Sequence, residues 1–285
     1  MKKPRKYFAV IVPLFAAYVI QIGVCLIGAL VYFFLSMIMV IYVRWEAITD
    51  GKFSINMTID QVINIITSQK FIELLDVMAT IVSIVLFYLW FKNIRRNNQK
   101  DTAMNLAAIF NVKIISLLFL FGLGYELLET GILNLTVQYY ADIYQDYSNL
   151  VTDFLDGNQI IILINLLLLA PILEELIFRG IIFMKACDIF PFIVANICQA
   201  AFFSLYHLNI FQGICAFIPG LLLGYITYLY KSIVASIVLH SFFNFFAYFM
   251  VIIYPSRVTY IIYSITGLAL FIIIFKIINK GAIKE

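Results

Sequence analysis

Residues 171–180 read PILEELIFRG and place two glutamates and an arginine within six residues, directly after a run of leucines. A charged side chain at the centre of a membrane helix costs about 2.5–3.5 kcal/mol, so three such side chains together are not expected to face lipid. Glu175 and Arg179 lie four residues apart with the acid first, which predicts an ion pair along one helix face. Glu174 is turned about 100° away from Glu175. We therefore expect Glu174 to be free for a different role.

The composition is that of an integral membrane protein. Apolar residues make up 64% of the 285 residues and charged residues 12%, whereas soluble domains have roughly 45–50% and about 25%. A soluble fold has too little interior to bury this much hydrocarbon. The net charge of +3, without a long basic run, argues against a nucleic-acid partner.

The apolar segments predict an all-α, polytopic membrane protein with about eight transmembrane helices. We divide the chain into residues 1–158, with N-terminal transmembrane helices and amphipathic outer segments but no motif, and a core, residues 159–285. The motifs of the core lie within residues 171–244, on successive helices. The front part is expected to carry no charge inside the membrane. The predicted spans are residues 8–42, 75–92, 103–124, 159–184, 190–209, 213–230, 233–253 and 258–276.

Lysine and arginine gather in alternate connections between the spans, and acidic residues lie in the others. By the positive-inside rule, both termini of this multi-pass cell-membrane protein lie in the cytoplasm. Residues 139–156 repeat apolar side chains at helical spacing, which predicts an amphipathic helix on the outer membrane surface. This helix would act as a structural brace or as a lid over a site. Residues 59–66 show a weaker pattern of the same kind.

Both histidines of the chain lie in predicted spans, on helices other than that of the glutamates. His207 follows Phe203 by four residues in FSLYH, and His240 precedes Asn244 by four in HSFFN. Ionisable side chains inside a membrane are candidates for a functional site. A carboxylate and an imidazole can activate water as a nucleophile, and two histidines with one carboxylate form a zinc site. His240 and Asn244 can instead donate hydrogen bonds to a developing oxyanion.

The position of His207 sets a condition on such a site. His207 lies near the outer end of its span, whereas Glu174 and His240 lie deeper in theirs. The link of residues 208–213 carries no charge, and its flanking spans are short. We therefore expect this hairpin apex to be sunk into the membrane, where it lines protein or a wet cavity. With the apex at the surface, the three motifs would not meet.

In their order on consecutive helices, the motifs EExxxR, FxxxH and HxxxN resemble those of the CPBP family, over roughly residues 159–253. This family, also called Abi, comprises CAAX proteases and bacteriocin-processing enzymes, among them the type II CAAX prenyl endopeptidases. The resemblance implies an intramembrane endopeptidase. The resemblance assigns the activation of water to Glu174 and His207, and the binding of the oxyanion to His240 and Asn244. Glu175, Arg179 and Phe203 are then supporting residues.

These residues are compatible both with a metal cofactor and with a mechanism that uses no metal. The family is often labelled a metalloprotease family, and if a metal is used, Glu174, His207 and His240 would hold it, with zinc as the candidate. Activation of water by a glutamate and a histidine needs no metal and is equally compatible with the sequence.

The expected partners are membrane lipid and a lipidated or membrane-bound peptide or protein substrate. A non-catalytic membrane protein in immunity or regulation is the alternative, because family members are also linked to bacteriocin self-immunity and such a role needs only binding. A transporter or proton relay also uses buried glutamate and histidine. The inverted repeats of many transporters are not evident here, which makes this third function less favoured.

Overall fold

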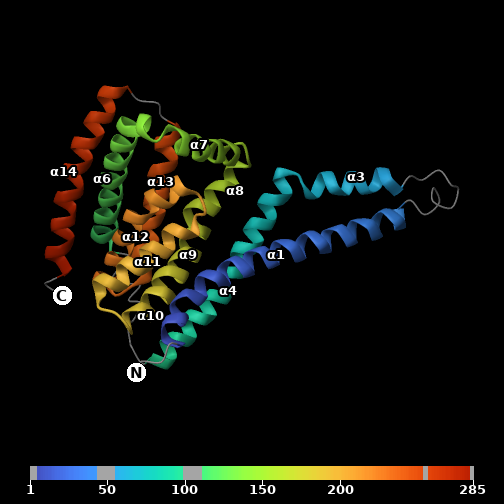
Figure 1. Cartoon of the computed structure of the whole chain (residues 1–285), viewed down its shortest axis with the longest axis horizontal. Coiled ribbons are helices and arrows are strands. Elements are labelled where there is room, and N and C mark those ends of the chain that lie inside the picture. The colour runs from blue at the N-terminus through green and yellow to red at the C-terminus, as the bar shows by residue number, and fades with distance from the viewer. Residues whose placement is uncertain (1–4, 44–54, 99–110, 253–255, 283–285) are drawn as a thin grey trace.

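The computed structural model describes residues 5–43, 55–98, 111–252 and 256–282, and every regular element in these ranges is helical. The all-α prediction is therefore confirmed. The helices form a bundle from which α1 and α3 project to one side (Figure 1). The elements are α1 (Arg5–Val43), α3 (Ile55–Ile66), α4 (Gln69–Asn98), α6 (Val112–Thr136), η1 (Val137–Tyr139), α7 (Ala141–Leu155), α8 (Gln159–Ile164), η2 (Asn165–Leu169), α9 (Ala170–Glu175), η3 (Leu176–Phe183), α10 (Met184–Cys187), α11 (Phe192–Tyr206), α12 (Ile210–Tyr230), α13 (Ile233–Ile252) and α14 (Arg257–Ala282).

Each predicted span has a helical counterpart among the described residues, outside which residues 103–110 of the third span and residue 253 of the seventh lie. Helix α11 is apolar and has only 15 residues, and α6, the counterpart of the third span, is not among the candidates. The protein is polytopic, whereas the count of eight is not confirmed. In the described part of the chain, six segments are long and apolar enough to cross a membrane: Tyr7–Val40, Gln69–Arg96, Gln159–Cys187, Ile210–Tyr230, Ile233–Met250 and Arg257–Lys280.

The apolar core consists of two clusters of buried side chains. The first joins α1, α4, α11 and the run from α9 to α10, and the second joins α6, α12, α13 and α14. Outside these clusters, large apolar side chains remain exposed along the spans, for example Phe8 at 70% and Ile160 at 71%. Apolar surface of this extent is rare on soluble monomers, and it agrees with a multi-pass membrane protein.

The expectation of a front part without intramembrane charge is wrong for Asp76. This residue lies in α4, inside a candidate span, and its Oδ2 accepts a hydrogen bond of 2.9 Å from Asn165 Nδ2. One turn earlier, Glu73 accepts the backbone N–H of Asn158 at 3.2 Å, directly before α8. A polar contact with another helix offsets part of the cost of a carboxylate among apolar side chains. The two carboxylates therefore tie α4 to the start of the motif-bearing helix run.

Both amphipathic segments are helices, as predicted. The stronger one is α7, which packs against α12 through the ring of Phe211. That ring contacts Tyr140, Tyr144 and Tyr147, with centroids 5.0–5.6 Å apart. This attachment agrees with a brace, while the place of α7 on the membrane surface stays a prediction.

Helices α6 and α14 approach each other closely at glycine residues. A Cβ atom on Gly267 of α14 would lie 2.4 Å from the backbone nitrogen of Leu128, and one on Gly124 of α6 would lie 2.8 Å from that of Phe271. No side chain fits at these distances without moving a helix backbone. Glycine is therefore required for this contact.

Gly267→Ala should lower the free energy of unfolding by about 1–3 kcal/mol, the usual cost of overpacking. Gly23→Ala is the matched control, because a Cβ atom there would meet nothing within 4 Å. Thermal unfolding of both purified variants in one detergent measures the difference. Equal melting temperatures would contradict the packing described here.

Candidate active site

The helix run that carries the two glutamates departs from α-helical geometry on both sides of them. The segments η2 and η3 are π-helical, and α9 between them, which ends at Glu175, is α-helical. Such π-turns occur frequently at functional sites. In η2, the backbone N–H of Ala170 bonds to the carbonyl oxygen of Asn165, five residues earlier. The next residue, Pro171, has no N–H to offer to Leu166.

The carbonyl oxygen of Leu166 is thus left without its helical partner, and the third motif supplies one. Asn244 Nδ2 of α13 donates to Leu166 O at 2.8 Å. This bond occupies one N–H of the Asn244 amide and leaves the second N–H free of it. A proline at the start of PILEELIFRG therefore creates the acceptor that fixes Asn244.

Glu175 and Arg179 form the predicted ion pair, with Oε1 and Nη1 2.7 Å apart and both side chains fully buried. The guanidinium also donates to the carbonyl oxygen of Gly220 in α12 at 3.0 Å and stands over the ring of Phe203 in α11, 4.5 Å from its centroid. His240 Nδ1 of α13 lies 2.9 Å from the same Glu175 oxygen. A fully buried charge pair thereby connects four helical segments.

Glu174 occupies a different environment from its neighbour. Its side chain keeps 15% exposure, against 0% for Glu175. Glu174 Oε2 lies 3.6 Å from Nε2 of His240, which is longer than a hydrogen bond. Glu174 is expected from the sequence to have no partner on its own helix, and the ionisable side chain 3.6 Å away, His240, belongs to another helix, α13.

His207 ends α11 and binds its own helix rather than a glutamate. Its Nδ1 lies 2.9 Å from the carbonyl oxygen of Phe203; because a carbonyl oxygen only accepts, Nδ1 donates this bond and Nε2 takes no part in it. The ring of Phe203 contacts both imidazoles edge-on, with centroid distances of 4.9 Å to His207 and 5.7 Å to His240. Phe203 is therefore the element that brings the second motif beside the third.

The turn after His207 is held by the N-terminal helix. Tyr18 of α1 donates to the carbonyl oxygen of Tyr206 at 2.8 Å, and the Tyr206 hydroxyl donates to Gln21 Oε1 at 3.0 Å. Leu208 has φ 56°, a left-handed conformation that costs free energy in a non-glycine residue. Helix α11 is about 22 Å long at 1.5 Å per residue, less than the roughly 30 Å of a bilayer core. These features agree with a hairpin apex that lies below the membrane surface.

Sequence reasoning missed four polar residues that support the site. Tyr18 and Gln21 hold the turn at His207, and Asp76 holds Asn165 directly before Leu166. The available signal was the same for all four, namely a polar side chain in an otherwise apolar segment. The polar residues predicted to form the site, by contrast, all lie in the C-terminal half of the chain.

The arrangement does not fit the predicted zinc ligands. Among the described residues, no three His, Cys, Asp or Glu side chains are grouped so that they could hold a metal ion. Nδ1 of His207 bonds to Phe203 O and Nδ1 of His240 to Glu175, which leaves the Nε2 atom of each imidazole outside these bonds. We therefore derive the chemistry below from the protein's own side chains.

The comparison with known families agrees with this geometry. Residues 156–246 match one family model, type II CAAX prenyl endopeptidase Rce1-like. The matched segment runs from the end of α7 into α13 and contains the three motifs. No curated protein and no solved structure matches the chain. The family match and the apolar helices together support an intramembrane endopeptidase as the general class of function.

Arg179→Met should destabilise the fold by about 3–5 kcal/mol, because it leaves the fully buried Glu175 carboxylate without its guanidinium. Replacing both residues, Glu175→Leu with Arg179→Met, removes both charges and should recover part of this loss. Thermal unfolding in detergent compares the two proteins. A double variant no more stable than Arg179→Met would contradict the role of the ion pair.

Proposed function

We propose that the protein is an intramembrane endopeptidase that hydrolyses a peptide bond in a membrane-associated protein or peptide. The substrate is of the CAAX type or a peptide precursor such as a bacteriocin. The nucleophile is a water molecule activated by Glu174 and His207. One observation carries this proposal: of two adjacent glutamates, Glu175 is fully buried in an ion pair, whereas Glu174 keeps 15% exposure and lies 3.6 Å from His240 Nε2, beyond hydrogen-bond distance.

The charges of the cluster favour this division of roles. Arg179 offsets the charge of Glu175 within the fully buried pair. His240 lies against Glu175 through Nδ1, and its Nε2 faces the side of Glu174, where a reacting carbonyl would lie.

The reaction then follows from general acid–base chemistry. Glu174, with Nε2 of His207, accepts a proton from water as the water oxygen attacks the carbonyl carbon of the peptide. Nε2–H of His240 and the second N–H of Asn244 donate to the oxyanion that forms. The proton held by Glu174 passes to the amide nitrogen, and the C–N bond breaks. The products are a carboxylate and an amine.

The basic residues support the proposed orientation, with both termini in the cytoplasm. Arg95 and Arg96 lie in the last turn of α4, Lys185 in that of α10 and Lys280 in that of α14. Figure 1 places these three helix ends at the same end of the bundle. Such clustering at one membrane side is the pattern of the positive-inside rule. The exposed apolar side chains of the spans make membrane lipid the expected surrounding partner.

His207→Ala tests the proposal on a panel of lipidated and unlipidated peptides. We expect the wild type to cleave at least one peptide and the variant to lose about 10²–10⁴-fold in kcat, the usual contribution of a general base. Ser241→Ala is the control, since its hydroxyl only donates to the carbonyl oxygen of Ile237 at 3.0 Å. Cleavage that survives His207→Ala at full rate would contradict the mechanism.

A strong chelator in the same assay tests the choice between a metal and side chains alone. The mechanism proposed here predicts unchanged cleavage by the wild type. Loss of cleavage with the chelator, restored by added zinc, would replace it with a metal-dependent reaction.

A further inference from the structure

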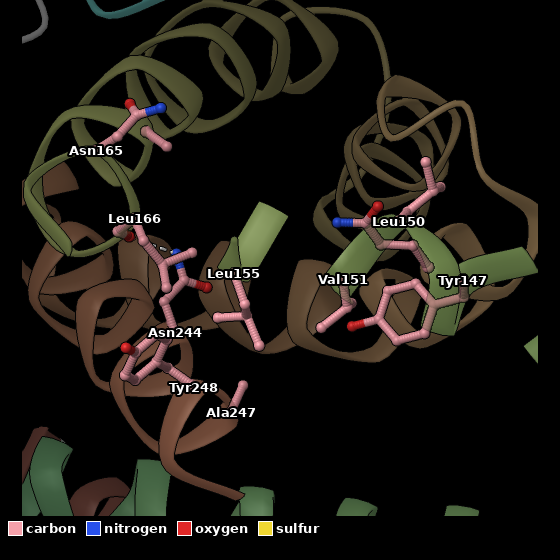
Figure 2. A pocket seen from close by; sticks show the side chains of 11 residues that line it. Tyr147, Leu150, Val151, Leu155, Asn165, Leu166, Asn244, Ala247 and Tyr248 are labelled. Carbon is pink, nitrogen blue, oxygen red and sulfur yellow. Dashed lines mark hydrogen bonds between the residues drawn. The ribbon is translucent and has the colours of Figure 1, made fainter. Parts of the chain in front are cut away.

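A cavity of about 410 Å³ lies between α7 and the helices of the first and third motifs. In Figure 2, Asn165, Leu166 and Asn244 form one side of it, and Tyr147 and Val151 of α7 form the other. Its volume is in the range of about 300–1,000 Å³ typical of ligand sites. The lining residues are Tyr147, Leu150, Val151, Leu155, Asn165, Leu166, Ala170, Gln212, Asn244, Ala247 and Tyr248.

The cavity adjoins the reacting groups. Asn244, which lines it, belongs to the third motif, and Ala170 lies one helical turn before Glu174. Leu150 of α7 is 53% exposed, so the cavity borders the outside of the molecule beneath this helix. A chain that occupies the cavity therefore leads from the surface at α7 toward Asn244 and Glu174.

The lining excludes a charged ligand. None of the lining residues carries a charge, and burial raises the pKa of the Tyr147 phenol, which keeps it neutral. An ionised phosphate or lipid headgroup would lose its hydration here without gaining a counter-charge. Three amide side chains line the cavity, namely Asn165 of η2, Gln212 of α12 and Asn244 of α13. Amides donate and accept hydrogen bonds, as does a peptide backbone.

We propose that this cavity binds an uncharged, extended stretch of the substrate polypeptide next to the bond that is cut. The amide side chain of Gln212 bonds the backbone of that stretch, and α7 forms the outer wall that selects its side chains. The proposal rests on the proposed function and gives it a substrate class. It also gives α7 a role in the site beyond that of a brace.

Photo-crosslinking tests the binding without depending on catalysis. Benzoylphenylalanine replaces Leu150 in the full-length Glu174→Gln variant, and Asp142, an exposed residue of α7 outside the cavity, carries it in the control. Two decapeptide libraries serve as probes, one of uncharged residues and one with Asp and Lys mixed in. We expect at least tenfold more crosslinking of the uncharged library at position 150, and none above background at 142. Equal crosslinking at both positions, a preference for the charged library, or no crosslinking at 150 would overturn the proposal.

Val151→Trp tests the same cavity in the active protein, with a peptide that the wild type cleaves. Filling the cavity should raise KM at least about tenfold and leave kcat within about twofold, because it removes binding that is common to ground state and transition state. Asn149→Trp, at an exposed position of α7 that does not line the cavity, should change neither. An unchanged KM in Val151→Trp would refute the site. If the wild type cleaves no peptide, the proposed function fails, and the crosslinking still decides whether the cavity binds peptide.

Discussion

The ion pair of Glu175 with Arg179 is the interaction on which the rest of the site depends. Both side chains are fully buried, and between them they contact α11, α12 and α13 through Phe203, Gly220 and His240. A buried pair contributes little net stability, because desolvation offsets most of its attraction. Its value here is geometric. It fixes His240 against one glutamate and thereby leaves the other available.

A second constraint comes from the backbone of the same helix run. Pro171 removes one donor, the π-turn before it shifts the hydrogen-bond register, and Leu166 is left to accept the Asn244 amide. Asp76 acts on the neighbouring residue, because it holds the Asn165 side chain from α4. The N-terminal helices therefore support the motif-bearing helices at two places, here and at the turn after His207.

Sequence reasoning reached the parts of this structure that follow from local spacing. The all-α architecture, the ion pair four residues apart and the amphipathic helix at residues 141–155 are confirmed. The two π-turns were not predicted, because the spacing of apolar and polar residues does not show where the helical hydrogen bonds shift to a partner five residues earlier. Asp76 was missed because it lay at the edge of an assumed span, where a charge needs no partner. The count of eight spans is not confirmed, because α11 has only 15 residues and α6 is not among the candidate spans of the described residues.

In the proposed mechanism the two adjacent glutamates have different tasks, since Glu174 activates water and Glu175 holds the buried ion pair. A comparison of Glu174→Gln with Glu175→Gln separates these tasks. Melting temperature and kcat would be measured for both purified proteins on one cleaved peptide. We expect Glu174→Gln to keep the wild-type melting temperature and lose cleavage, and Glu175→Gln to melt at a lower temperature because Arg179 loses its counter-charge. Cleavage at the wild-type rate by Glu174→Gln would show that Glu174 does not activate the water.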